Sequence, residues 1–140
     1  MSDNSKARHW FYQDGAKKGV EYKTELLNEN NILQQRTEQI LESRQKDGYT
    51  IIQIGSQISF LFEGKEFPLI QQTNYTYDDY GNIKAIINYG DLSKKGDELY
   101  TSYEYVYALD KWIISSIKDA SVFDANKTKL RQTQYAYDAQ

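Results

Sequence analysis

Hydrophobic and polar residues alternate along most of this chain, and the alternation is clearest near its middle. Tyr75 and Tyr77 stand between polar residues, and the same pattern resumes over 83–89. A period of two residues is typical of a β-strand that buries one face. The residues between, 78–82, favour a turn, because Asp and Asn bond their own backbone and Gly81 tolerates a positive φ. The pattern therefore predicts a β-hairpin whose loop is longer than two residues.

The same alternation on both sides of this hairpin predicts a mainly β fold, an antiparallel meander of about eight or nine strands. Turn signals rich in Gly, Asp and Asn separate the strands. Gly55 interrupts one strand and indicates a bulge. The expected strands are Val20 to Leu26, Ile32 to Arg44, Tyr49 to Phe62, Leu69 to Tyr77, Ile83 to Tyr89, Leu99 to Leu109, Trp112 to Phe123 and Leu130 to Tyr137.

The segment 32–44 is open to two interpretations. Its Gln, Glu, Arg and Leu residues favour a helix. The polar turn before it, Asn28 to Asn31, favours a strand, because it resembles a degenerate copy of the turn at 78–82 with Asn31 in the place of the glycine. We prefer the strand and keep the helix as the alternative.

Composition narrows the class of protein. A chain of 140 residues makes one domain at most, and we expect a flexible, polar N-terminus over 1–8 followed by a single β-rich region over 9–140. The 13 tyrosines suit half-buried sheet positions. The net charge of −3 gives no reason to expect a nucleic-acid partner, and no apolar run approaches the ~20 residues that span a bilayer. The first residues lack the apolar core of a Sec signal peptide.

Candidate chemistry is sparse, and we expect no catalytic, cofactor-binding or metal-binding residues. His9 is the only histidine and cysteine is absent, which rules out a multi-histidine or thiolate metal site within this chain. Asp78 and Asp79 are adjacent, so on a strand their side chains point to opposite faces and do not make an acid–base pair. Calcium at these two residues and Asn82 is conceivable, but the spacing of an EF-hand loop is missing. The tyrosine rows either pack the sheet or offer aromatic faces to a sugar.

One motif resembles a known family. The run Tyr-x-Tyr-Asp-x-x-Gly-Asn-Ile is similar to the repeat unit of Rhs/YD-repeat proteins, and the resemblance is strongest over 69–138. The flanking words Asn-Tyr-Gly-Asp, Tyr-Glu-Tyr and Asp-Lys-Trp-Ile-Ile resemble the Rhs-like segment of the B component of bacterial insecticidal toxin complexes. Tyr-Asp or Phe-Asp recurs at 77–78, 123–124 and 137–138, as in a loose repeat. The structural motif residues that carry the resemblance are Tyr75, Tyr77, Asp78, Gly81, Asn82, Tyr137 and Asp138.

The resemblance implies a non-catalytic segment of a secreted bacterial toxin shell. In that family, strands spiral into a hollow β-cocoon that encloses a toxic C-terminal polypeptide. The partners would be neighbouring Rhs repeats or other toxin-complex subunits. A whole shell takes many hundreds of residues, so we expect this chain to form only part of one. The self-cleavage signature of the family contains Asp-Pro, which this sequence lacks. The alternative is a stand-alone β-sheet module that binds glycan or a protein partner through exposed tyrosines.

Overall fold

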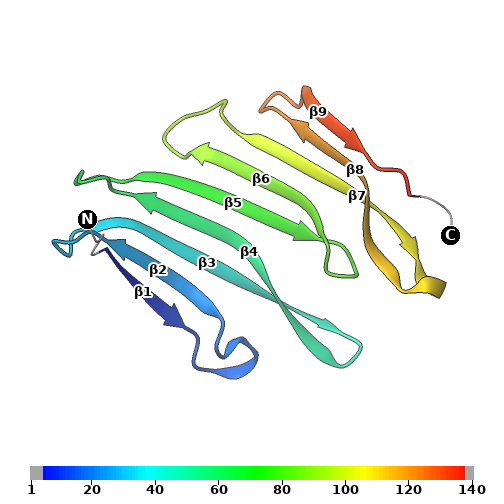
Figure 1. Cartoon of the computed structure of the whole chain (residues 1–140), viewed down its shortest axis with the longest axis horizontal. Coiled ribbons are helices and arrows are strands. Elements are labelled where there is room, and N and C mark those ends of the chain that lie inside the picture. The colour runs from blue at the N-terminus through cyan, green and yellow to red at the C-terminus, as the bar shows by residue number, and fades with distance from the viewer. Residues whose placement is uncertain (1–4, 138–140) are drawn as a thin grey trace. The chain divides into compact units, whose positions relative to one another are not determined.

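The computed structural model describes residues 5–137 and folds them almost entirely into β-strands (Figure 1). The strands follow one another in the sheet in the order of the chain, which makes an antiparallel meander. The mainly β class and the strand count are therefore confirmed. The elements are β1 (Lys6–Phe11), η1 (Gly15–Lys17), β2 (Glu21–Leu27), β3 (Leu33–Lys46), β4 (Tyr49–Leu61), β5 (Leu69–Tyr77), β6 (Ile83–Asp91), β7 (Leu99–Ala108), η2 (Leu109–Lys111), β8 (Ile113–Phe123) and β9 (Lys129–Gln134).

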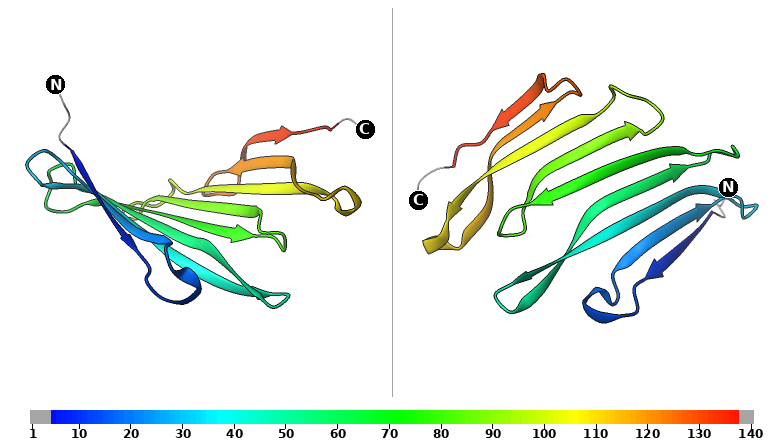
Figure 2. Two further views of the ribbon diagram at one scale, coloured as in Figure 1. Left: turned by 60° about the horizontal axis from the view of Figure 1, so that its bottom comes forward. Right: turned by 180° about the vertical axis from the view of Figure 1, so that it is seen from behind.

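The chain divides into two compact units. The first comprises Met1–Gln72 with Asp91–Ser93, and the second comprises Thr73–Gly90 with Lys94–Gln140. In each unit the strands lie in one layer, and no described residue forms a second layer over them (Figures 1 and 2). Among residues 5–137, no helix has the length and apolar character needed to cross a membrane.

The ambiguous segment is a strand, as we preferred. β3 pairs with β4 from Gln35 opposite Leu61 to Lys46 opposite Tyr49. Asp47 and Gly48 join the two strands, with φ values of 49° and 85°. Two successive positive φ values are typical of the tight hairpin turn whose twist matches that of its strands. This long ladder overrides the helix preference of the individual residues, because propensity is a weak determinant beside tertiary pairing.

The predicted bulge at Gly55 is confirmed. Ile40 lies opposite Ser56 and Leu41 lies opposite Ile54, which leaves Gly55 as the extra residue of β4. A Cβ atom built on Gly55 would come within 2.5 Å of the Glu42 side chain. Because Gly55 has no side chain, the Glu42 side chain of the neighbouring strand can cross over the bulge.

Two expected boundaries were wrong at the ends of the described region. The sheet begins at Lys6, which pairs with Leu27, so residues 6–8 belong to β1 and not to a flexible N-terminus. The backbone N–H and C=O groups of these polar residues pair with β2, and the polar sequence alone gives no sign of that pairing. At the other end β9 stops at Gln134, three residues before the expected Tyr137.

Very little of the sheet is buried. Leu27 and Leu41 are the buried hydrophobic residues among those described, and Ser56 and Ser121 are the buried polar ones. Phe67 and Trp112 remain 79% and 89% exposed. Since antiparallel sheets ordinarily pack one face against a core, each unit has large apolar side chains that nothing in the described region covers.

Candidate functional site

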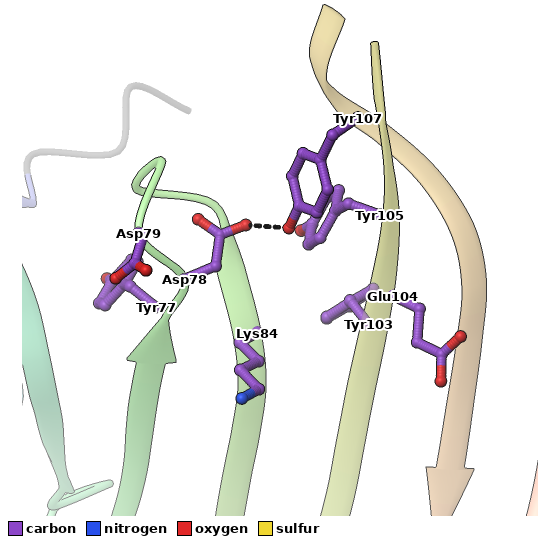
Figure 3. Close-up of a pocket in the computed structure, with 8 residues that line it drawn as sticks. All are labelled: Tyr77, Asp78, Asp79, Lys84, Tyr103, Glu104, Tyr105 and Tyr107. Carbon is purple, nitrogen blue, oxygen red and sulfur yellow. Dashed lines mark hydrogen bonds between the residues drawn. The ribbon is translucent and has the colours of Figure 1, made fainter. Parts of the chain in front are cut away.

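A pocket of about 460 Å³ lies beside the hairpin tip between β5 and β6, within the second unit (Figure 3). The end of β5, the tip, the start of β6 and the second half of β7 all contribute to it. The lining residues are Tyr77, Asp78, Asp79, Lys84, Tyr103, Glu104, Tyr105 and Tyr107. It is the best candidate for a functional site, because it gathers two of the predicted motif residues, Tyr77 and Asp78, with tyrosines from a later strand.

The carboxylate of Asp78 organises this site. Its Oδ1 accepts hydrogen bonds from the backbone N–H groups of Tyr80 and Asn82, both at 2.9 Å. Its Oδ2 accepts one from Asn82 Nδ2 at 2.8 Å and one from the Tyr107 hydroxyl at 2.7 Å. The backbone closes the same turn, and Gly81 has a φ of 88° as predicted. Both oxygens of Asp78 are thus committed to holding the tip.

The pKa shifts agree with a structural role for this carboxylate. Burial raises the pKa of Asp78, but hydrogen bonds from Tyr107, Asn82 and two backbone N–H groups outweigh it, and the pKa lies below its ordinary value. The same hydrogen bond, helped by burial, raises the pKa of Tyr107 to about 12. Near neutral pH, Asp78 is therefore charged and Tyr107 protonated. A general base would instead need a pKa close to the working pH.

The tip is also tied to strands further along the chain. Asn82 Nδ2 donates to the backbone oxygen of Ile114, at the start of β8. The Tyr105 hydroxyl donates to the backbone oxygen of Ile83 at 2.8 Å. Four side chains consequently fix one turn, two from the turn itself and two from β7.

The turn at 78–82 recurs at two other hairpin tips, 28–32 and 124–128. In each, a side-chain oxygen of the first residue accepts hydrogen bonds from the backbone N–H groups of the third and fifth residues. The fourth residue has a positive φ: 60° at Asn31, 88° at Gly81 and 62° at Lys127. The prediction that 28–31 is a degenerate copy of the central turn is therefore confirmed.

The other predicted motif residues are not all brought to the site. Tyr75 is half-buried in β5, and Tyr77 lines the pocket. Tyr137 is exposed, and its hydroxyl donates to the backbone oxygen of Ile117 at 2.7 Å. Asp138 lies outside the described residues.

Sequence reasoning missed the partners of Asp78. Tyr107, which bonds Asp78, and Tyr105, which bonds Ile83, were predicted only as members of an alternating row. The 29 residues between Asp78 and Tyr107 gave no sign of contact. His9, for its part, contacts Glu21 through Nδ1 at 2.9 Å on the surface of the first unit. Within 5–137, no group of three or more His, Cys, Asp or Glu side chains is arranged to hold a metal ion.

Comparison of the chain with protein-family models, with curated proteins and with solved structures gives no match.

Proposed function

We propose that this chain is a non-catalytic wall segment of a larger β-shell, of the Rhs/YD-repeat type, that encloses a toxic polypeptide. The observation that carries the proposal is the shortage of buried side chains in both units. Leu27 and Leu41 alone are buried hydrophobic residues in the described region, whereas large apolar side chains such as Phe67 and Trp112 are open. A sheet of this kind gains its missing burial from further strands or from contents that cover its faces.

The chemistry of the candidate site favours the same function. Asp78 is the most embedded acid of the pocket, and its two oxygens already accept four hydrogen bonds. A carboxylate that is held in this way stiffens a hairpin tip and has no lone pair directed at a substrate. A shell that must exclude proteases from its contents needs rigid tips of this kind.

Purification of the chain together with the products of its neighbouring genes tests the proposal. We expect a polypeptide to copurify and to resist protease in the native complex, and to be degraded at the same protease concentration once urea has opened the complex. The chain purified alone is the matched control. A chain that is monomeric and protease-resistant, with no companion, would contradict a wall function.

A glycan-binding module is the second candidate, and one observation favours it. The rings of Tyr80 and Tyr107 lie with centroids 4.9 Å apart and are 41% and 42% exposed. Exposed aromatic rings suit the apolar face of a sugar, and Tyr107 also lines the polar pocket. Binding on a glycan array that Tyr80→Ala abolishes, with the fold intact, would favour this function over the shell.

A further inference from the structure

We propose that the outer edge of β9, together with the tip at 124–128, is a docking site for a strand of a partner polypeptide that carries two tyrosines in the spacing Tyr-x-Tyr. The second tyrosine would donate its hydroxyl to Asp124, as Tyr107 does to Asp78. The proposal extends the wall function by naming the chemistry that joins this chain to its neighbour.

The tips at 78–82 and 124–128 are equivalent in their backbone geometry. Asp124 Oδ1 accepts the N–H groups of Asn126 and Thr128 at 2.9 and 2.8 Å, as Asp78 Oδ1 does those of Tyr80 and Asn82. The Oδ2 atoms differ. Asp78 Oδ2 accepts two hydrogen bonds, whereas Asp124 Oδ2 accepts none from any residue in 5–137.

The difference arises from the strand that follows each hairpin. β7 lies beside β6 and delivers Tyr107 to the first tip. β9 is the last strand in the order of the described sheet, and no strand of residues 5–137 lies at its outer edge (Figure 1). An open strand edge accepts a further strand through its backbone groups, and pockets for alternate side chains select which strand binds.

The register of β6 and β7 specifies where the incoming tyrosines must lie. Ala85, seven residues after Asp78, pairs with Ser102, and Tyr105 and Tyr107 follow Ser102 by three and five residues. Arg131 is the residue seven places after Asp124. The incoming strand therefore runs antiparallel to β9 and has tyrosines three and five residues after the residue opposite Arg131. Their hydroxyls would reach the backbone oxygen of Lys129 and Asp124 Oδ2.

The tip at 28–32 supplies an internal control. Its first residue is Asn28, an amide, so the position of the second carboxylate oxygen is taken by a nitrogen that donates. Gln35, seven residues after Asn28, pairs with Leu61, and the residues three and five places later are Gly64 and Glu66. Tyrosine donors thus accompany the carboxylate tip and are missing where the tip has an amide.

A second copy of this chain does not fit the required register. In a second copy, the Tyr-x-Tyr that lies just after the edge strand is Tyr135 and Tyr137. These tyrosines are three and five residues after Gln132, so Gln132 of that copy would have to lie opposite Arg131. When two copies pair antiparallel through β9, corresponding faces of the two sheets lie on the same side. Residues that lie opposite each other in such a pair have their side chains on the same side of the sheet. Arg131 and Gln132 are consecutive, so their side chains point to opposite faces. The partner is therefore a different strand.

Fluorescence anisotropy with the full chain and a labelled peptide tests the proposal. The probe is a peptide with the sequence of residues 99–109, which contains the tyrosines that already serve Asp78. A second peptide has Phe in place of its last tyrosine, and the chain variant is Asp124→Asn. Asn28 shows that an asparagine makes the same turn, so this variant should fold.

We expect saturable binding that the tyrosine-to-Phe peptide or Asp124→Asn weakens about tenfold, with little further loss when the two are combined. Equal affinity of both peptides for the unmodified chain would overturn the proposal even if Asp124→Asn failed to fold, as would an absence of saturable binding. Self-association of the chain that Asp124→Asn abolishes would make a second copy the occupant and overturn the partner named here. Protease protection of contents is a separate measurement, so the wall function can fail or stand by itself.

Discussion

The phenol of Tyr107 donates a 2.7 Å hydrogen bond to Oδ2 of Asp78, which lies 29 residues earlier in the chain. The contact joins the end of β7 to the tip between β5 and β6 (Figure 3). A turn that local sequence already favours is thereby tied to a strand outside its own hairpin.

Removing that hydroxyl should weaken the second unit. Tyr107→Phe deletes the hydrogen bond and leaves the ring in place, and we expect a loss of about 1 kcal/mol in the free energy of unfolding. Hydrogen bonds to charged groups contribute more when buried, but this side chain is 42% exposed and solvent reduces the effect. Urea denaturation measures it. Tyr103→Phe is the control, because no described residue bonds the Tyr103 hydroxyl; an equal loss in both variants would contradict the assignment.

The stabilisation by this pair should depend on pH at both extremes. The pKa of Tyr107 is raised to about 12 from 10.0, so its contribution is complete below about 10 and is lost as the pH rises to about 12. The pKa of Asp78 is lowered, so its contribution is present above its ordinary value near 4 and is lost as the pH falls below that. We therefore expect the stability difference between wild type and Tyr107→Phe to shrink in both ranges. A difference that stays constant from pH 3 to 12 would refute the link.

Substitutions at the fourth residue of the tips should act in opposite directions. Gly81 has a φ of 88°, so Gly81→Val should destabilise the chain by about 1–3 kcal/mol. Lys127 occupies the equivalent position with a φ of 62°, and Lys127→Gly should stabilise the chain by up to about 1 kcal/mol because it relieves left-handed strain. Thermal melts of both variants measure the effects. An unchanged melting temperature for Gly81→Val would show that the turn does not limit stability.

A side chain added at Gly55, in the bulge of β4, should lower stability because it meets the Glu42 side chain. Gly55→Ala places a Cβ within 2.5 Å of the Glu42 side chain, which is exposed and able to move, so we expect a loss of about 1 kcal/mol or less. In a Glu42→Ala background the same substitution should be neutral or stabilising. A double-mutant cycle from urea denaturation measures the coupling. Additive effects of the two changes would mean that the side chain does not cross the bulge.

The outward backbone groups of β9 should promote self-association or aggregation of the purified chain, by strand pairing that does not use the Asp124 carboxylate. The N–H donors of this edge can be identified. The N–H of Tyr135 donates to the backbone oxygen of Lys118, and Thr133 pairs with Ala120. Because N–H groups alternate in direction along a strand, the N–H of Thr133 points inward to β8. The N–H of Gln132 points outward, to the open edge. Gln132→Pro should therefore reduce association, as sedimentation at several concentrations would show. Gln132→Ala removes the same side-chain contacts and keeps the N–H, so it should not. Thr133→Pro should instead detach β9 from β8.

Local sequence determined the strands and the tips of this protein. Alternation is sufficient to predict a strand because successive side chains point to opposite faces, and Asn31 and Gly81 mark tips because few residues tolerate a positive φ. The segment 33–46 is different: its residues favour helix, and the ladders with β2 and β4 make it a strand.

Tertiary structure decided which residues meet. In β7 and β8, Glu104 lies opposite Asp119 and Tyr105 lies opposite Ile117, so Lys118 is an extra residue that no turn or glycine announces. One such bulge changes which side chains share a face beyond it. The tyrosine that reaches Asp78 is likewise fixed by register, that of β6 with β7, in which Ala85 lies opposite Ser102. Register is a property of the paired strands and cannot be read from either strand alone.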